Sequence, residues 1–320
     1  MSPSHDIIRE ELRIFDRVFR DSVKSHVPLL DRIMRYVVKT KGKQMRPMFV
    51  ILSAKLYGPV TDSTYRAASL VELLHTASLV HDDVVDGAME RRGFLSVFAV
   101  WRSKVSVLVG DYLLAKGLLL SLENDDFQVL KIMSRAVRQM SEGELIQMEK
   151  SRMLDLDEET YFTIIRNKTA SLLASACASG AYSVTESTEE AEKLRLFGEL
   201  VGIAFQIKDD LFDYGSADVG KPTGNDIREK KLTLPLIHSL SQADRGTRRE
   251  LIYVLKNENR IRARIDWVIG KVQALGGIAY AREKMIEYRD RSMEILHSFE
   301  PGPVRDALES LVRYTTDREK

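Results

Sequence analysis

The strongest constraint on this chain is an acidic pattern, D-D-x-x-D, that occurs twice inside apolar, helix-compatible runs. It occupies residues 82–86 and again residues 209–213. In a helix, the first and last acids of the pattern lie about 40° apart on one face and ~5.4 Å apart along the axis. Carboxylates at that spacing repel each other unless a cation lies between them, and Mg²⁺ prefers such oxygen ligands. The repeat therefore predicts two helices that share a metal cluster.

A single acidic group of this kind is also typical of a solvated helix face. Both groups here have Val, Leu or Phe as neighbours, and a helix that packs into a core does not carry three acids without partners. We therefore interpret all six acids as candidate Mg²⁺ ligands or as supports for the metal. They are Asp82, Asp83, Asp86, Asp209, Asp210 and Asp213.

Helical periodicity runs through almost the whole chain. Apolar residues repeat at three- and four-residue steps in 8–19 and 29–37, and Asp62 or Ser63 is expected to cap the helix that leads to the first acidic group. Further helices are predicted at about 105–122, 126–150, 158–183, 188–214, 232–242, 245–257, 260–273, 275–298 and 303–316. No segment alternates like a strand and no linker is evident. The prediction is one all-α domain over residues 1–320.

Composition excludes several classes of protein. The 48 basic and 47 acidic residues give a net charge of +1, so the protein has no overall positive potential that would favour binding to nucleic acid. The single cysteine, Cys177, excludes an internal disulfide, and the N-terminus does not resemble a signal peptide. Residues 105–122 approach the length of a membrane span, but Asp111 and Lys116 interrupt them, so a central buried helix is the better interpretation. We expect a cytoplasmic protein without a transmembrane segment.

A long break at 214–231 follows the second acidic group directly. Its glycines and Pro222 are typical of an ordinary surface loop. Its position beside Asp209 would let Lys221, Lys230 and Lys231 reach an anion held there, and loops beside a site often act as lids.

The motifs and their order resemble the trans-type polyprenyl diphosphate synthases, relatives of farnesyl and geranylgeranyl diphosphate synthase. The motifs are GKQMRP at 42–47, HTASLVHDDVVD at 75–86, RRG at 91–93, GDYLLAK at 110–116, GELIQ at 143–147, NKTASLL at 167–173 and FQIKDDLFDYGSADVGKPTGNDIREKKLTLPL at 205–236. The resemblance covers nearly the whole chain. It implies the isoprenoid synthase fold, a single large helical bundle around a central cavity, and a homodimer.

The resemblance also implies an activity. This is a Mg²⁺-dependent prenyltransferase that condenses isopentenyl diphosphate with an allylic diphosphate through a carbocation, giving an all-trans polyprenyl diphosphate. Asp82, Asp86 and Asp209 are similar to the family's metal ligands. Lys168, Thr169 and Gln206 are implied as catalytic, the last two with oxygens that face the cation. Arg91, Lys168, Lys221 and Lys231 resemble contacts to the allylic diphosphate, and Lys43, Arg46, His75 and Arg92 the cradle of isopentenyl diphosphate.

The residue chemistry agrees with these roles, because two diphosphates in one pocket need many cations, and Arg and Lys supply them. Other interpretations stay open for single residues. Lys43 and Arg46 could be loop charges, and His75 a hydrogen-bonded core histidine. Arg91 and Arg92 could be a solvated helix end. Lys230 stands where the family often has Gly, and Phe94-Leu95-Ser96 departs from the family's usual continuation.

Product length is predicted from the residues before the first acidic group. Short-chain members of the family commonly carry a bulky aromatic near Ala77 and Ser78, which are small here. A growing tail could then pass toward Leu74, with ~18 Å of further helix back to Tyr65. We predict a product longer than C20, in the C30–C40 range. Ala77 could instead be small because a neighbouring helix packs closely.

Three alternatives to a long-chain synthase remain. One is a short-chain synthase that stops at C15–C20. A terpene cyclase of the same fold usually pairs one D-D-x-x-D with a different metal motif and needs no isopentenyl diphosphate cradle. A non-catalytic partner subunit tends to lose the acids, which are intact here.

Overall fold

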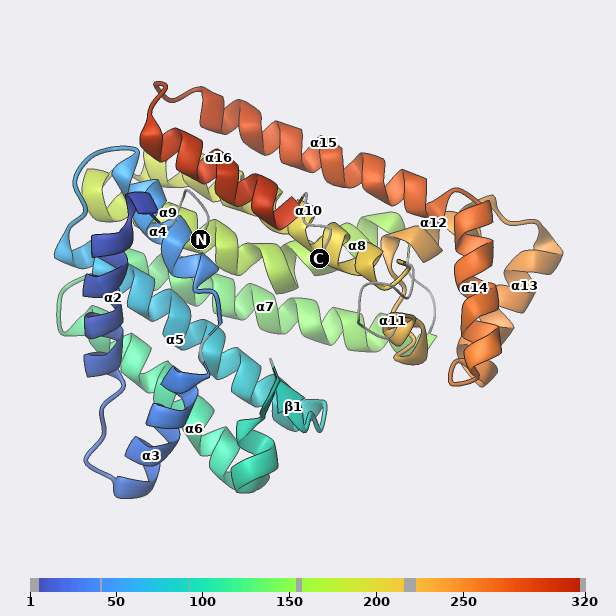
Figure 1. Cartoon of the computed structure of the whole chain (residues 1–320), viewed down its shortest axis with the longest axis horizontal. Helices are drawn as coiled ribbons and strands as arrows, with labels where there is room; N and C mark the ends of the chain where they lie inside the picture. Colours follow the sequence, from blue (N-terminus) through green and yellow to red (C-terminus); the bar gives the residue numbers. More distant parts are fainter. Residues whose placement is uncertain (1–5, 41, 92, 154–156, 216–222, 317–320) are drawn as a thin grey trace. The chain divides into compact units, whose positions relative to one another are not determined.

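The computed structural model describes residues 6–40, 42–91, 93–153, 157–215 and 223–316, and these are helical almost throughout (Figure 1). The prediction of an all-α fold is confirmed. The elements in order are α2 (Arg9–Ser22), α3 (Pro28–Lys39), α4 (Met45–Lys55), α5 (Asp62–Val85), β1 (Glu90–Arg91), β2 (Phe94–Leu95), α6 (Val97–Leu122), α7 (Phe127–Met153), α8 (Glu158–Ile165), the π-helical turn η1 (Arg166–Ala170), α9 (Ser171–Thr185), α10 (Thr188–Phe212), α11 (Asn225–Arg228), α12 (Leu234–Gln242), α13 (Arg245–Tyr253), the π-helical turn η3 (Val254–Glu258), α14 (Arg262–Ala274), α15 (Gly277–His297) and α16 (Pro303–Thr316).

The structure differs from the predicted elements in several places, among them the helix predicted at 245–257, which ends in the π-helical turn η3. A two-stranded antiparallel hairpin pairs Glu90 with Leu95 and Arg91 with Phe94, and strands of two residues are too short to show alternation. The helix predicted at 158–183 contains η1, a turn that apolar spacing does not reveal. The predicted break at 214–231 contains the one-turn helix α11.

Residue contacts divide the chain into two compact units. The first contains Met1–Val137, Leu172–Leu196 and Phe299–Ser310, and the second contains Arg138–Ser171, Phe197–Ser298 and Leu311–Lys320. Helices α7, α10 and α16 contribute to both units. The assignment of residues 1–320 to one domain stays a prediction.

Helix α5 is the centre of the first unit, where it packs against α2, α4 and α6. Two glycines of α6 permit a close approach. A Cβ atom at Gly110 would lie 2.1 Å from Nε2 of His81, and one at Gly117 would lie 2.8 Å from Cδ1 of Leu70. His81 therefore fills the space opposite Gly110, as expected for a structural histidine.

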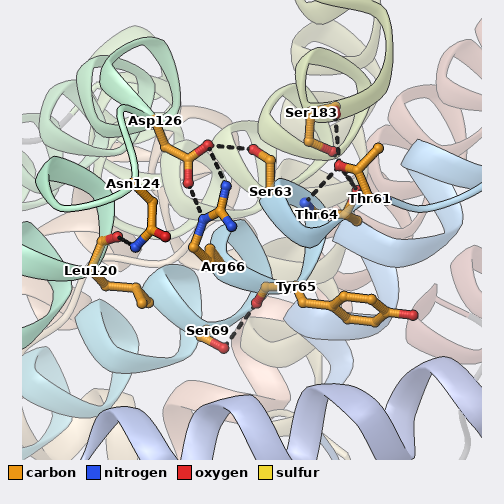
Figure 2. Close-up of polar contacts among 10 residues, drawn as sticks. All are labelled: Thr61, Ser63, Thr64, Tyr65, Arg66, Ser69, Leu120, Asn124, Asp126 and Ser183. Atoms are coloured by element: carbon orange, nitrogen blue, oxygen red, sulfur yellow. Dashed lines mark hydrogen bonds and ion pairs between the residues drawn. The ribbon is translucent and has the colours of Figure 1, made fainter.

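The first turn of α5 is held by a capping box, and Thr61 makes it instead of the predicted Asp62 or Ser63 (Figure 2). The hydroxyl of Thr61 accepts from the N–H of Thr64 at 3.3 Å, and the hydroxyl of Thr64 accepts from the N–H of Thr61 at 3.1 Å. The Thr64 hydroxyl also lies 2.7 Å from that of Ser183. The start of α5 is thus fixed to α9.

An ion pair follows one turn later. The guanidinium of Arg66 pairs with the carboxylate of Asp126, which also accepts from the hydroxyl of Ser63 at 2.6 Å (Figure 2). Both charged side chains are largely buried. Together with the cap, this pair makes the N-terminal end of α5 polar, whereas the next turns are apolar.

The prediction of a central buried helix at 105–122 is wrong in part. Only 33% of the most apolar window of α6 is buried, and α6 is the one helix among the described residues with a length and composition that would also fit a membrane span. Val109, Leu113 and Gly117 are buried, but other apolar side chains of α6 are exposed. They include Val107, Leu108, Leu118, Leu119 and Leu122. The reason is that α6 packs mainly against α5, with smaller contacts to α3 and β2.

The second unit has a core of its own. Helices α12, α14 and α15 pack against one another (Figure 1). The same apolar cluster includes Ile203 and Ile207 of α10 together with Ile165 of α8 and Ala170 of η1. The helix that carries the second acidic group therefore has a rigid apolar side beneath it.

Candidate active site

The first acidic group lies at the C-terminal end of α5, and its three acids have different surroundings. Asp86 is exposed and Asp82 is half-buried, whereas Asp83 is only 2% exposed. Asp83 accepts from Nε of Arg91 at 2.6 Å. Burial raises the pKa of Asp83, and the Arg91 guanidinium opposes that rise. Asp83 is therefore committed to the hairpin that follows α5.

Arg91 and Asp83 also line a pocket in the first unit, which we call the α5 pocket. Its other polar lining residues are Tyr36, Thr40, Gln44, Glu72, Thr76 and Ser96. The ion pair to Asp83 uses one N–H of the Arg91 guanidinium, which has five. The geometry is therefore compatible with the predicted anion contact of Arg91.

Two of the four residues predicted to cradle isopentenyl diphosphate meet in the first unit. Nη1 of Arg46, in the first turn of α4, lies 2.9 Å from Nε2 of His75 on α5. Lys43 is exposed just before α4. Arg92 lies outside the described residues. The structure thus brings Arg46 and His75 together, and the cradle as a whole stays a prediction.

The residues predicted to control product length lie on the part of α5 before the acids. Ala77 is fully buried and Leu74 is 6% exposed. Ser78 is half-buried, and its hydroxyl donates to the carbonyl of His75 at 2.9 Å. None of the three lines the α5 pocket. Because Gly117 of α6 packs against Leu74, close helix packing remains an alternative reason for small residues here.

The second acidic group lies at the C-terminal end of α10. Asp209 is exposed, and Asp210 is 6% exposed. Asp210 accepts from the hydroxyl of Tyr161 at 2.7 Å and from Nε2 of Gln206 at 2.8 Å. Burial raises the pKa of Asp210 to about 7, although these two hydrogen bonds oppose the rise. Asp213 accepts from the backbone N–H groups of Asn225 and Asp226 at 2.8 and 3.0 Å.

Asp209 and Asp210 line a second pocket, which lies wholly within the second unit and which we call the α10 pocket. Its other polar lining residues are Gln147, Ser151, Tyr161, Lys168, Thr169, Gln206, Asp226, Lys231 and Thr233. It brings together six residues that the sequence assigned to the site. They are Lys168, Thr169, Gln206, Asp209, Asp210 and Lys231.

The cations of the α10 pocket have acidic neighbours. Nζ of Lys168 lies 2.5 Å from Glu144 and donates to Oε1 of Gln147 at 3.2 Å. Nζ of Lys231 lies 2.5 Å from Glu229 and 3.9 Å from Asp226. Both ammonium groups are therefore paired with carboxylates in the structure.

The neighbouring lysines behave differently. Nζ of Lys230 donates to the carbonyl of Lys256 at 2.9 Å, and Lys230 is absent from the lining of the α10 pocket. Lys221, predicted as a further anion contact, lies outside the described residues. Of the two adjacent lysines at 230 and 231, the geometry favours Lys231 as the anion contact.

Close helix packing sets the geometry of the α10 pocket. A Cβ atom at Gly202 would lie 2.6 Å from Cα of Ala170, so α10 approaches η1 as closely as backbone allows. A Cβ atom at Gly143 would lie 2.8 Å from the backbone nitrogen of Lys168. Helices α10 and α7 thus both contact η1, the turn that carries Lys168 and Thr169.

Several residues at this pocket were not predicted from the sequence. Gln147, which lines the pocket, and Glu144, which pairs with Lys168, belong to the motif GELIQ, to which no role was assigned. Asp226, which also lines the pocket, belongs to the stretch NDIR after the break. Burial and the charge of Asp213 raise the pKa of Asp226 to about 7, although Lys231 lowers it. Tyr161 had no signal, because its spacing is that of any apolar helix face.

The comparisons with known proteins decide the family. The polyprenyl synthetase profile matches residues 27–272 of the chain. The chain belongs to the polyprenyl synthetase family. It is 35% identical over 314 residues to an all-trans-nonaprenyl-diphosphate synthase (geranyl-diphosphate specific) of Rhodobacter capsulatus, with 97% of this chain and 96% of the relative covered.

Two solved structures of polyprenyl synthetase relatives cover almost the same length. The decaprenyl diphosphate synthase of Rhodobacter capsulatus superposes with a TM-score of 0.93 at 32% identity, over 99% of this chain and 98% of that one. The geranylgeranyl pyrophosphate synthase of Bacteroides thetaiotaomicron gives a TM-score of 0.84 at 37% identity, over the same shares. The all-α isoprenoid synthase fold and prenyltransferase activity follow from this membership.

The structure also gives a physical account of Phe94-Leu95-Ser96, where this chain departs from the polyprenyl synthetase pattern. Phe94 and Leu95 form β2 and are 49% and 54% exposed. The carbonyl of Leu95 accepts from the hydroxyl of Tyr36 at 2.6 Å. Ser96 caps α6 by accepting from the N–H of Ala99, and its hydroxyl donates to the carbonyl of Ala88. The segment thus closes the hairpin and starts the next helix.

Proposed function

We propose that this chain is a long-chain polyprenyl diphosphate synthase that condenses isopentenyl diphosphate with an allylic diphosphate. The observation that carries the proposal is the α10 pocket, which places Lys168, Lys231 and Asp209 beside the polar oxygens of Thr169 and Gln206. This arrangement suits a substrate with a diphosphate at one end and a developing cation beside it.

The proposed condensation begins when the C–O bond of the allylic diphosphate breaks and its electron pair leaves with pyrophosphate. The double bond of isopentenyl diphosphate attacks the allylic cation, a new C–C bond forms, and a proton is lost to the released pyrophosphate. The side chains bind, orient and stabilise charge, so no protein nucleophile is required.

Mg²⁺ fits the donor chemistry of this chain. Asp82, Asp86 and Asp209, the acids proposed as direct ligands, are exposed at least in part, whereas Asp83 and Asp210 are committed to protein contacts. In the described part of the chain, no three His, Cys, Asp or Glu side chains cluster closely enough to hold a metal ion. Mg²⁺ commonly takes one or two carboxylates together with substrate phosphates and water. When bound, it would neutralise charge on the leaving diphosphate.

The basic residues would divide between the two substrates. Lys168 and Lys231 bind the allylic diphosphate, whose several negative charges would replace the contacts of these lysines with Glu144 and Glu229. Arg46 and His75, already 2.9 Å apart, would bind isopentenyl diphosphate with Lys43. Each diphosphate thus meets several cations.

We propose that the part of α5 before the acids sets the length of the product. Ala77 and Ser78 are small side chains that would leave room for a tail, and the buried apolar residues Leu74 and Leu70 continue toward the polar start of the helix. We propose that the ion pair of Arg66 there marks the end of the path (Figure 2). The nonaprenyl and decaprenyl names of two relatives support a product longer than C20, whereas the geranylgeranyl name of the third keeps C20 as the alternative.

Substitution of Ala77 by Phe tests the path. The larger side chain should truncate the product to C15–C20 and leave the first condensation largely active, which chromatography of the dephosphorylated products would show. A wild-type product of C20 or shorter, or an unchanged product length in Ala77→Phe, would exclude this path for the growing tail.

Incubation of the purified protein with Mg²⁺, farnesyl diphosphate and labelled isopentenyl diphosphate tests the activity itself. Elongated linear products are expected. Cyclic hydrocarbons would instead indicate a terpene cyclase, and inactivity without a second protein would indicate a non-catalytic partner subunit. Either outcome would refute the proposal.

We propose a homodimer formed through the exposed apolar face of α6. Leu108 is 68% exposed and Leu119 is 47% exposed, and side chains of this kind in a row mark protein interfaces. Sedimentation should give twice the 36.4 kDa of one chain. A cytoplasmic location stays a prediction.

A further inference from the structure

A chain of three hydrogen bonds links the core of the second unit to the α10 pocket. The hydroxyl of Tyr161 on α8 donates to Oδ2 of Asp210 at 2.7 Å. Nε2 of Gln206 donates to Oδ1 of the same carboxylate at 2.8 Å. The hydroxyl of Thr169 on η1 donates to Oε1 of Gln206 at 2.7 Å. Each member lines the α10 pocket, and Tyr161 is only 3% exposed.

With Asp210 ionised, the direction of every bond in this chain is fixed. The carboxylate then only accepts, so Gln206 turns its NH₂ group toward Asp210 and its carbonyl oxygen toward Thr169. The Thr169 hydroxyl must then donate its single proton to that carbonyl. Both lone pairs of the Thr169 oxygen are left for other partners, and the residue lines the pocket.

We call the hydrogen-bonded series Tyr161, Asp210, Gln206 and Thr169 the relay. We propose that Tyr161 and Asp210 are positioning residues that set which groups of the relay donate and which accept, so that Thr169 faces the allylic cation as a pure acceptor. The inference rests on the proposed function, because it assigns the cation to this pocket. An oxygen with lone pairs toward the site stabilises positive charge, whereas an O–H turned toward it would oppose that charge. Tyr161 acts through Asp210 and Gln206 and touches no reacting atom itself.

The packing around the relay keeps its members in register. Gly202 lies one turn before Gln206 on α10, and no side chain separates that turn from Ala170 of η1. The turn η1 is π-helical, a form that often occurs at functional sites. This close packing holds η1 against α10 and thereby keeps Thr169 at hydrogen-bonding distance from Gln206.

Tyr161→Phe removes the first hydrogen bond and keeps the ring. We expect kcat to fall about 10-fold, the size of one hydrogen bond to a charged group. The KM of isopentenyl diphosphate should stay within about twofold, because the relay faces the cation and not that diphosphate.

A double-mutant cycle separates a relay from a local packing effect. In a Thr169→Val background the oxygen is already absent, so Tyr161→Phe should change kcat by less than about twofold. Thr169→Ser restores a hydroxyl and should restore the full effect of Tyr161→Phe. Equal effects of Tyr161→Phe in the wild-type and Thr169→Val backgrounds would overturn the proposal.

Tyr280 offers a matched control. Its hydroxyl also donates to a carboxylate, that of Glu158, at 2.7 Å in the same unit, and it does not line the α10 pocket. Tyr280→Phe should leave kcat within about twofold of wild type. An equal loss of kcat in both Phe variants would mean that any tyrosine hydroxyl bonded to a carboxylate matters, and would refute a specific role for Tyr161.

Two further outcomes are distinguishable. If Tyr161→Phe does not fold, as judged by circular dichroism, Gln206→Met breaks the relay at its centre and takes its place in the same cycle. Wild-type protein without elongation activity would refute the proposed function. Active wild type with a fully active Tyr161→Phe would refute the relay alone.

Discussion

The contact between α10 and η1 gives a prediction with a worked magnitude, tested by Gly202→Ala. The new Cβ atom would lie 2.6 Å from Cα and 2.7 Å from Cβ of Ala170. Carbon atoms prefer separations of about 3.5–4.0 Å, so the two backbones must separate by about 1 Å. That shift would lengthen the Thr169–Gln206 hydrogen bond from 2.7 Å to beyond the useful range.

Two opposing effects set the change in stability. Overpacking typically costs about 1–3 kcal/mol, and here the upper part of that range applies because one of the contacted atoms belongs to the backbone. Alanine recovers about 1 kcal/mol through its better helix propensity. Gly202→Ala should therefore lower the free energy of unfolding by about 1–2 kcal/mol and also lower kcat.

Urea unfolding followed by circular dichroism measures the first effect, and Gly270→Ala is its control. Gly270 also lies inside a helix, α14, but a Cβ atom there would meet nothing within 4 Å. This variant should gain about 0.5–1 kcal/mol of stability and keep its kcat. A Gly202→Ala protein as stable and as active as Gly270→Ala would refute the packing argument.

Three further predictions concern single side chains. Asp209→Ala should reduce turnover by orders of magnitude while substrate binding weakens less, and near-normal turnover at saturating Mg²⁺ would exclude Asp209 as a metal ligand. Lys43→Ala should raise the KM for isopentenyl diphosphate about 10- to 150-fold and the KM for the allylic substrate less, whereas equal effects would mean that the two cradles are wrongly divided. Burial raises the pKa of Cys177 to about 12, so a disulfide reagent near neutral pH should label no thiol in the folded protein and one after denaturation, and rapid labelling of the native protein would contradict that burial.

The sequence allowed the helices and six of the polar residues that line the α10 pocket to be predicted, because both depend on local patterns. Apolar spacing located α7 and α16 to within a few residues. Burial could not be predicted in the same way, since it depends on which neighbour covers a face. That is why α6 was expected to be central and why Tyr161, whose hydroxyl meets Asp210 from another helix, had no signal.

The acids of each D-D-x-x-D motif have different roles in the structure, which the sequence alone could not reveal because all of them are aspartates. Successive residues of a helix point about 100° apart, so the second acid of each group faces away from the first. In both copies that second acid is buried and bonded to the protein: Asp83 to Arg91, and Asp210 to Tyr161 and Gln206. The first acid of each group, Asp82 or Asp209, stays accessible at least in part. Each motif thus offers one acid to a ligand and uses the next to hold its own surroundings in place, which is why replacing the second acid should disturb geometry before it disturbs metal binding.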